Sequence, residues 1–187
     1  MKSDSIRIAN CSGFYGDKLS VARDMIEGGP IDVLTGDYLA ELTMTILYNQ
    51  RLKRGEQHGY VGTFLKQFRD VAKLAQEKNI KIVTNAGGLN PSSMADSVKE
   101  IIDELNLDLK VAHIEGDDLI PRIDELYQGG EKLTNIDKSL DLQNYKKKPI
   151  TANAYLGAWG IKEALDNGAD VVICPRVTDA AVVIGPA

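Results

Sequence analysis

Short apolar runs alternate along the chain with longer segments in which apolar residues recur at helical spacing. The short runs are rich in valine and isoleucine, and several lack the apolar–polar alternation of a half-exposed strand: Ile6–Cys11, Asp32–Gly36, Lys81–Ala86, Leu109–Glu115 and Asp170–Pro175. Strands that are buried on both faces have this pattern, which is typical of parallel sheets covered by helices. The pattern therefore predicts five parallel strands.

The longer segments predict helices. Apolar residues return every three or four positions in residues 38–51, 64–75, 94–105 and 154–165. Alternation of strands and helices implies a parallel sheet with right-handed crossovers. We therefore expect a three-layer α/β sandwich with a mostly parallel sheet. An incomplete β/α barrel is the alternative, because repeated βα units do not by themselves fix whether the sheet closes.

One stretch interrupts this rhythm. Residues 129–149 are polar and form too long a segment for an ordinary connection. We interpret them as a peripheral insertion or as a lid over a site, and we expect them to be less ordered than their neighbours because they carry few apolar anchors. The rest reads as a single α/β domain over residues 1–187. The abrupt end in "DAAVVIGPA" predicts the N-terminal part of a longer chain.

Composition narrows the class of protein. The 187 residues carry a net charge of −5, with 43% hydrophobic and 26% charged residues, which is ordinary for a globular domain. The acidic balance argues against a nucleic-acid partner, because phosphate binding needs clustered lysine and arginine. Cys11 and Cys174 give no disulfide framework, and we expect both to be small buried side chains. Without a signal-peptide pattern or a long apolar run, we expect a cytoplasmic protein with no membrane partner.

Each predicted strand is followed by a loop that combines glycine or proline with small polar or acidic residues: "CSGFYGD", "TGDYLAE", "NAGGLNPSS", "EGDD" and "PRVTDA". The carboxyl ends of parallel strands meet at one edge, outside which ligands bind in open α/β sheets. Helix capping is the alternative explanation for Asp17, Asp37, Asp118 and Asn90. Capping does not explain the glycine pair, the acidic cluster after the fourth strand or Arg176.

We therefore expect one cleft at this edge, lined by residues from all five loops. The glycine backbone and Arg176 would hold a carboxylate or phosphate, and an acidic residue would transfer a proton. The candidates for acid–base catalysis are Asp117, Glu115 and Asp37. The candidates for ligand binding are Ser12, Gly13, Asn85, Gly87, Gly88, Arg176 and Asp179. The acidic members also suit magnesium, although no cofactor is fixed by this pattern.

Several familiar motifs are absent. The glycines do not give the dinucleotide or ATP-binding spacing, and there is neither a zinc motif nor the serine elbow of α/β-hydrolases. His113 lies within a predicted strand, where we expect it to be buried. Trp159 falls off the apolar face of its predicted helix, with Tyr155 one turn earlier. We expect this pair to form a second packing face, while an oligomer contact and a site wall remain the alternatives.

The loops together resemble a known family. The stretches that carry the resemblance are "IANCSGFYGDKLSVARDMIEGGPIDVLTGDYLAELTM", "VTNAGGLNP", "IEGDDL", "ANAYLGAWGIKEAL" and "PRVTDAAVVIGPA". They resemble the N-terminal core domain of the acyclic terpene utilisation (AtuA-like) family. The resemblance implies a bacterial protein of citronellol and geraniol degradation, in which intermediates travel as coenzyme A thioesters. Family members often have Gly-Arg where this chain has Pro175-Arg176, and the resemblance supplies no catalytic residue.

Two functional hypotheses follow. The first is an enzyme, a lyase or hydrolase, that acts on a small anionic substrate, either a carboxylate or an acyl-coenzyme A. The second is a non-catalytic subunit or scaffold that forms a homo-oligomer or joins an acyl-coenzyme A carboxylase-type partner. A cleft at the loop edge would favour the enzyme, whereas a flat edge with a large apolar patch elsewhere would favour the scaffold.

Overall fold

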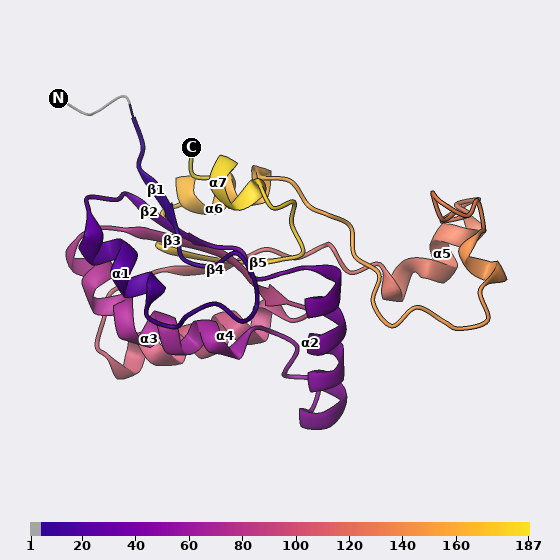
Figure 1. The fold of residues 1–187 in the computed structure, drawn as a ribbon, viewed down its shortest axis with the longest axis horizontal. Helices are drawn as coiled ribbons and strands as arrows, with labels where there is room; N and C mark the ends of the chain where they lie inside the picture. Colours follow the sequence, from indigo (N-terminus) through magenta and orange to yellow (C-terminus); the bar gives the residue numbers. More distant parts are fainter. Residues whose placement is uncertain (1–4) are drawn as a thin grey trace.

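A five-stranded parallel sheet forms the centre of the molecule (Figure 1). The computed structural model describes residues 5–187. The strand order is β1-β2-β3-β5-β4, and every neighbouring pair is parallel. The strands are β1 (Ile8–Asn10), β2 (Val33–Gly36), β3 (Lys81–Gly88), β4 (Val111–His113) and β5 (Val171–Pro175). All five predicted strands are confirmed, with ends that differ from the predicted ones by up to two residues.

Helices cover both faces of the sheet, so the three-layer sandwich is confirmed (Figure 1). One face carries α1 (Val21–Gly28), α3 (Gly62–Glu77) and α4 (Pro91–Glu104). The opposite face carries α6 (Trp159–Asp166) and α7 (Ala181–Ile184). The remaining long helix, α2 (Glu41–Arg54), stands beyond the carboxyl ends of the strands.

The two faces of the sheet bury two separate clusters of apolar side chains. On β3, Ile82 packs into the cluster with α1, α3 and α4, and its neighbour Val83 packs into the opposite cluster. On β5, Ile173 and Val172 divide in the same way. Because consecutive side chains point to opposite faces, a strand covered on both sides needs an unbroken apolar run. The free thiols of Cys11 and Cys174 are buried, as expected.

The chain reverses its course after β4. The first three crossovers place their helices on one face, whereas α6 returns from β4 to β5 across the other face. As a result β5 lies between β3 and β4. The chain leaves β3 for α4 on one face and leaves β5 for α7 on the opposite face. This divergence makes a topological switch point between the ends of β3 and β5, where open α/β sheets hold their ligands.

An arm projects from the body between β4 and α6 (Figure 1). It contains α5 (Ile123–Gln128) and the short 3-10 turns η1 (Ile120–Arg122) and η2 (Leu142–Asn144). At its neck, Asp118 and Asn153 form an antiparallel bridge. The amide of Leu119 donates to the carbonyl of Ala152 at 2.7 Å. The inserted segment is therefore longer than the predicted residues 129–149.

The helix predicted over residues 154–165 is shorter than expected, because its first residues belong to the neck. Residues 154–158 do not begin α6, which starts only at Trp159. The amide of Leu156 instead donates to the carbonyl of Arg176 at 3.2 Å, and Leu156 forms a parallel bridge with Val177. The backbone of this stretch pairs with the chain after β5, so it is held extended. Across residues 5–187, every helix lacks the length and apolar character that a bilayer crossing requires.

Candidate functional site at the carboxyl edge of the sheet

Arg176, the first residue after β5, is a buried cation at the switch point, with only 4% of its surface exposed. Its Nη1 donates to the carbonyl of Leu39 at 3.1 Å and to Asp179 Oδ1 at 3.2 Å. Its Nε is buried and has no hydrogen-bond partner within residues 5–187. A buried donor without a partner costs about 1–3 kcal/mol, so an arriving oxygen atom would be stabilised there.

The ring of Tyr155 holds the guanidinium plane. The Cζ atom of Arg176 lies 4.1 Å from the centre of this ring. The Tyr155 hydroxyl in turn donates to the carboxylate of Glu41, the first residue of α2. Burial by itself lowers the pKa of Arg176, but the contacts with Tyr155 and Asp179 outweigh it and the pKa rises. Arg176 therefore stays positively charged in its buried position.

Asn85 connects β3 to the loop that follows β2. Its side chain is fully buried, and its Oδ1 accepts from the amide of Tyr38 at 2.7 Å. Its Nδ2 donates to Asp37 Oδ1 at 2.5 Å. Partial burial raises the pKa of Asp37, the hydrogen bond from Asn85 opposes that rise, and the charge of Asp179 adds to it. Asp37 is thus a half-buried carboxylate whose pKa responds to both Arg176 and Asp179.

Asp117 is buried more deeply and ties the neck of the arm to the end of β5. Its Oδ2 accepts from Asn153 Nδ2 at 2.8 Å and from the amide of Arg176 at 3.2 Å. Its carbonyl accepts from the amide of Ala154 at 2.7 Å. Burial raises the pKa of Asp117, and these hydrogen bonds oppose the rise. The carboxylate therefore stabilises the attachment of the neck to the end of β5.

The loop after β1 lies against this group. The carbonyl of Ser12 accepts from the amide of Asp37 at 2.9 Å, and its hydroxyl donates to the carbonyl of Phe14 at 2.9 Å. The amide of Gly13 donates to Asp17 Oδ2 at 2.6 Å. Asp17 therefore closes its own loop rather than capping α1, which begins after Ser20. The structure thus places Ser12 next to Asp37, while Gly13 is exposed.

Close packing requires the glycine pair at the end of β3. A Cβ at Gly87 would lie 2.6 Å from the carbonyl oxygen of Cys174, and a Cβ at Gly88 would lie 2.3 Å from Leu47 Cδ1. The amides of the next two residues, Leu89 and Asn90, donate to Gly59 O and Gly87 O. The amides that follow the glycine pair are therefore already occupied and are not free to hold an anion. The side chain of Asn90 caps α4 as predicted, accepting from the amide of Ser93 at 3.1 Å.

Glu115 is separated from this group. Its carboxylate is 64% exposed and lies 3.3 Å from Nε2 of His113. Within residues 5–187 it forms no hydrogen bond or ion pair with Asp37, Asn85 or Arg176. The prediction that His113 is buried is wrong, because β4 is a three-residue strand at the edge of the sheet. Within residues 5–187, no three His, Cys, Asp or Glu side chains form a group that could hold a metal ion.

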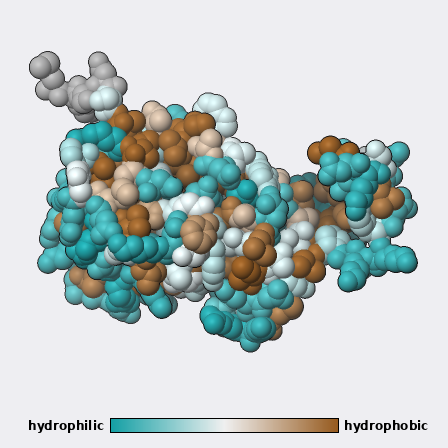
Figure 2. All heavy atoms as spheres, viewed as in Figure 1, coloured by the Kyte–Doolittle hydropathy of each residue, from teal (hydrophilic) through white to brown (hydrophobic). Residues whose placement is uncertain are grey.

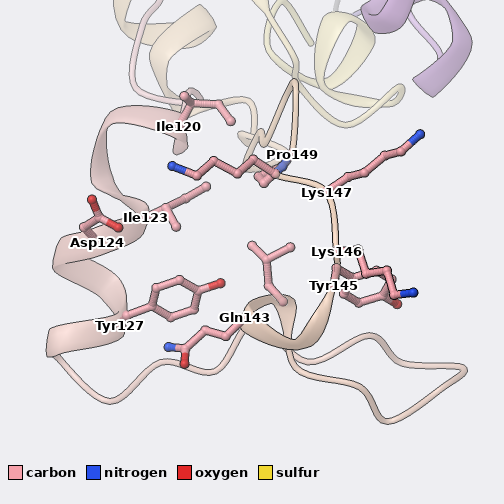
Figure 3. A pocket seen from close by; sticks show the side chains of 11 residues that line it. Ile120, Ile123, Asp124, Tyr127, Gln143, Tyr145, Lys146, Lys147 and Pro149 are labelled. Carbon is pink, nitrogen blue, oxygen red and sulfur yellow. The ribbon is translucent and has the colours of Figure 1, made fainter.

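Two cavities lie beyond the site, toward the arm. A cavity of about 310 Å³ separates α2 from the foot of the arm and is lined by Leu52, Leu89, Asp118 and Ile120, among others. A larger cavity of about 580 Å³ lies within the arm (Figure 3). Ile120 is the one residue that lines both of these cavities.

Trp159 is not a packing residue, which corrects the expectation for this side chain. It is 82% exposed and lines a cavity of about 520 Å³ together with Ile184 and Ala181. Apolar surface is visible over the part of the body where α6 and α7 lie (Figure 2). Tyr155, its predicted packing companion, instead forms a wall of the site against Arg176.

Sequence reasoning missed Leu39, Glu41 and Asn153. The carbonyl of Leu39 binds the guanidinium, Glu41 fixes Tyr155, and Asn153 fixes Asp117. Glu41 stood in one of the polar loops already singled out, but nothing in its surroundings pointed to a tyrosine more than a hundred residues later. Asn153 lies in the neck, which the pattern had assigned to the approach to a helix.

The fold and the site define a parallel α/β protein with a charged polar group at the switch point of its sheet. The chain belongs to the acyclic terpene utilisation family, since the model of the "Acyclic terpene utilisation family protein AtuA" matches residues 6–187. This membership connects the protein with acyclic terpene utilisation. No curated protein and no solved structure matches the chain significantly.

Proposed function

We propose that this protein is an enzyme that binds an acyclic terpenoid acid, free or as its coenzyme A thioester, at the switch point between β3 and β5. The observation that carries the proposal is the buried guanidinium of Arg176, whose Nε has no partner among the described residues. A carboxylate or thioester carbonyl oxygen would supply the missing acceptor. The stacked ring of Tyr155 would keep the donor plane fixed before the substrate arrives.

Asp179 accepts from Arg176 Nη1 and not from Nε, which is unpartnered within residues 5–187, so it would be displaced only by a second oxygen of the substrate. Its carboxylate is 69% exposed and makes a single hydrogen bond with Arg176 Nη1. The other partner of Nη1, the carbonyl of Leu39, belongs to the backbone and stays in place. A substrate oxygen can therefore replace Asp179 without unfolding the loop. Hydrogen bonds to a charged group contribute roughly 1.5–3 kcal/mol each, which is enough to fix the acid in one orientation.

Asp37 is the favoured acid–base residue among the three candidates. It is half-buried, its pKa is raised, and its electrostatic neighbours are Arg176 and Asp179. The carboxylate of Asp117 is committed to Asn153 and to the amide of Arg176, and Glu115 is exposed beside His113. In its ionised form Asp37 would accept a proton from the substrate or from water, which is the step that a lyase or a hydrolase needs at an activated carbonyl.

The affinity of Arg176 variants tests this proposal. Arg176→Ala should weaken binding of citronellic acid and its coenzyme A thioester by about 2 kcal/mol, or roughly 30-fold in Kd. Isothermal titration calorimetry of the full chain supplies the Kd, and circular dichroism checks that the variant is folded. Arg69→Ala serves as the matched control, because Arg69 on α3 forms an exposed ion pair with Glu104 on α4, away from the site. Equal affinities in wild type and Arg176→Ala would overturn the proposal.

A non-catalytic assembly role is the second candidate, and the exposure of Trp159 favours it. A tryptophan that is 82% exposed beside Ile184 is typical of a protein-binding surface. Under this alternative, Trp159→Ala would abolish assembly with an acyl-coenzyme A carboxylase-type partner in analytical ultracentrifugation. Arg176→Ala would then assemble with the partner like wild type and show no loss of affinity for the terpenoid acid. The two candidate functions therefore predict opposite results for the Arg176 and Trp159 variants.

A further inference from the structure

Arg176 is enclosed, although the proposed function needs an oxygen of the ligand to reach it. Its side chain is only 5% exposed, and its Nε is buried without a partner within residues 5–187. A ligand can therefore reach Nε only after a neighbouring group has moved. We infer that Tyr155 is the gate of this site: its ring closes over Arg176, and it opens when its hydrogen bond to Glu41 breaks. This inference rests on the proposed function, because it describes how the same site admits its ligand.

The core holds the inner neighbours of Arg176 in place. Leu39, whose carbonyl accepts from Nη1, is buried in the apolar cluster that packs against α1, α3 and α4. Asp117, which accepts from the amide of Arg176, is only 5% exposed and is also bonded to Asn153. Cys174, two residues earlier on β5, is completely buried. None of these three neighbours can leave Arg176 without disrupting the core or the neck.

Tyr155 is attached differently. It is 48% exposed, and it belongs to the segment 118–155, from which neither apolar cluster includes a residue. Its ring nevertheless covers one face of the guanidinium group, with its centre 4.1 Å from Arg176 Cζ. Asp179 is exposed as well, but it contacts the edge of the guanidinium group through Nη1 and covers neither face. Exposed side chains change rotamer rapidly, so the ring can turn away while β5 and α2 stay in place.

The hydrogen bond from the Tyr155 hydroxyl to the carboxylate of Glu41 holds the gate closed. Glu41 is the first residue of α2, a helix of 14 residues, so the position of the acceptor is fixed. The hydrogen bond lowers the pKa of Glu41, and the carboxylate is therefore ionised at neutral pH. Hydrogen bonds to an ionised group are stronger than neutral ones, and the stacked cation stabilises the same position of the ring. The closed state is thus favoured, which lowers the apparent affinity for a ligand that needs the open state.

The reaction of Arg176 with phenylglyoxal, which modifies accessible guanidinium groups, tests the gate without a substrate. Mass spectrometry of peptic peptides gives the rate at each arginine of the full chain. In wild type, Arg176 should react at least about tenfold more slowly than Arg69, whose side chain is 47% exposed. Tyr155→Phe keeps the ring but loses the hydrogen bond, so it should raise the rate at Arg176 at least about tenfold. Tyr127→Phe removes a hydroxyl from α5 in the arm and should react like wild type.

The thiol of Cys174 distinguishes an open gate from a general loosening of the fold. This thiol is free and buried on β5, so a disulfide reagent reaches it only when the sheet opens. Tyr155→Phe should leave the rate of its reaction within about twofold of wild type. The inference is overturned if Tyr155→Phe leaves the rate at Arg176 unchanged, or if the reaction of Cys174 accelerates as much as that of Arg176.

Calorimetric titration with citronellic acid separates this inference from the proposed function. Because a closed gate lowers the apparent affinity, Tyr155→Phe should bind the acid at least about threefold more tightly than wild type. Weaker binding would make the hydroxyl a direct contact of the ligand and would also overturn the gate. If Arg176→Ala binds the acid like wild type, the proposed function fails, while the phenylglyoxal rates still decide whether Tyr155 covers Arg176. If those rates do not depend on Tyr155 but Arg176→Ala loses affinity, the gate fails and the proposed function stands.

Discussion

Asp117 and Asp37 are acidic residues that both follow a strand, yet their surroundings give them different tasks. Asp117 accepts hydrogen bonds from Asn153 and from the amide of Arg176, so it joins three segments of chain. Asp37 accepts from Asn85 but keeps a partly open position beside the charge of Arg176. A buried carboxylate that is fully engaged stabilises structure, whereas a half-buried one with a raised pKa can exchange protons.

Removal of the Asp117 carboxylate should destabilise the fold. Asp117→Ala leaves the amide of Arg176 and the side chain of Asn153 without their acceptor, so we expect about 2 kcal/mol less free energy of unfolding. Asp117→Asn keeps an oxygen that can accept both bonds and should remain within about 1 kcal/mol of wild type. Urea denaturation at pH 7 measures both values. A loss as large in Asp117→Asn as in Asp117→Ala would show that the charge, not the acceptor, is what the fold requires.

The raised pKa of Asp117 also fixes the direction of a pH effect. The folded state takes up a proton more readily than the unfolded state, so wild type gains stability as the pH falls through the raised pKa. Asp117→Asn has no such proton to bind. The stability of wild type relative to Asp117→Asn should therefore increase as the pH falls from 7 toward the ordinary carboxyl range. A difference that stays constant with pH would contradict the assignment.

Asp179 should tune the pKa of Asp37. The negative charge of Asp179 raises the pKa of Asp37, so Asp179→Asn should lower it, because the Asp37 carboxylate then meets less repulsion. NMR titration of the Asp37 side-chain carboxyl carbon gives the pKa directly, without a substrate. If Asp37 is the catalytic base, the acid side of the kcat/KM profile should move to lower pH by the same amount. Asp166→Asn, at an exposed position on α6, is the control and should change neither value.

Individual site residues could be predicted where the chain order fixes their position. Arg176 and Asp37 directly follow buried strands and Asn85 lies in the last half of β3, so the parallel sheet brings these residues to one edge. Asn153 could not be predicted as a member, and the sequence offered a site wall only as an alternative role for Tyr155, because both residues reach the site from the neck of the arm. Their contacts depend on how a long connection returns to the body, which no local pattern describes.

At the scale of elements, the end of β3 packs closely against β5, against α2 and against the loop that contains Gly59. Gly88 pairs with Pro175 after a register shift, at a φ of +55°. Gly88→Ala would combine this unfavourable φ with a Cβ placed 2.3 Å from Leu47 Cδ1 and 2.8 Å from the carbonyl oxygen of Gly59. The variant should lose more than about 2 kcal/mol in free energy of unfolding.

Gly62→Ala is the matched control for this substitution. A Cβ at Gly62 meets no atom within 4 Å, and the residue begins α3. The control should therefore change stability by less than about 1 kcal/mol in the same urea titration. Equal effects of the two substitutions would mean that Gly88 is not held by packing, and its retention would then have to be explained by ligand contact.

Whether a segment forms a strand or a helix could be predicted for strands that are covered by helices on both faces. The prediction failed for residues 154–158, which lie in the connection from the arm to the body. The continuous apolar runs of β3 and β5 follow from helices on both faces. The apolar spacing in residues 154–158 looked helical, but the backbone there pairs with the chain after β5 and stays extended. The position of β5 between β3 and β4 was also beyond local pattern, because it depends on which face α6 crosses.

At the scale of the molecule, the arm and the body differ in what holds them. Neither apolar cluster of the body includes a residue from 118–155. The arm is attached through its neck, where Asp117 and Asp118 face Ala154 and Asn153. The arm is therefore a part of the molecule that the core does not hold rigid.

Hydrogen exchange should therefore divide the molecule at the neck. Residues 129–149 have largely exposed backbone and few apolar contacts, so their amides should exchange close to the rate of an open chain. Amides of α4 near Ile101, which packs into the core, should be protected by global stability instead. Mass-spectrometric exchange of the full chain compares the two peptides in one experiment. Equal protection of the arm and α4 in the unliganded protein would show that the arm folds as part of the body.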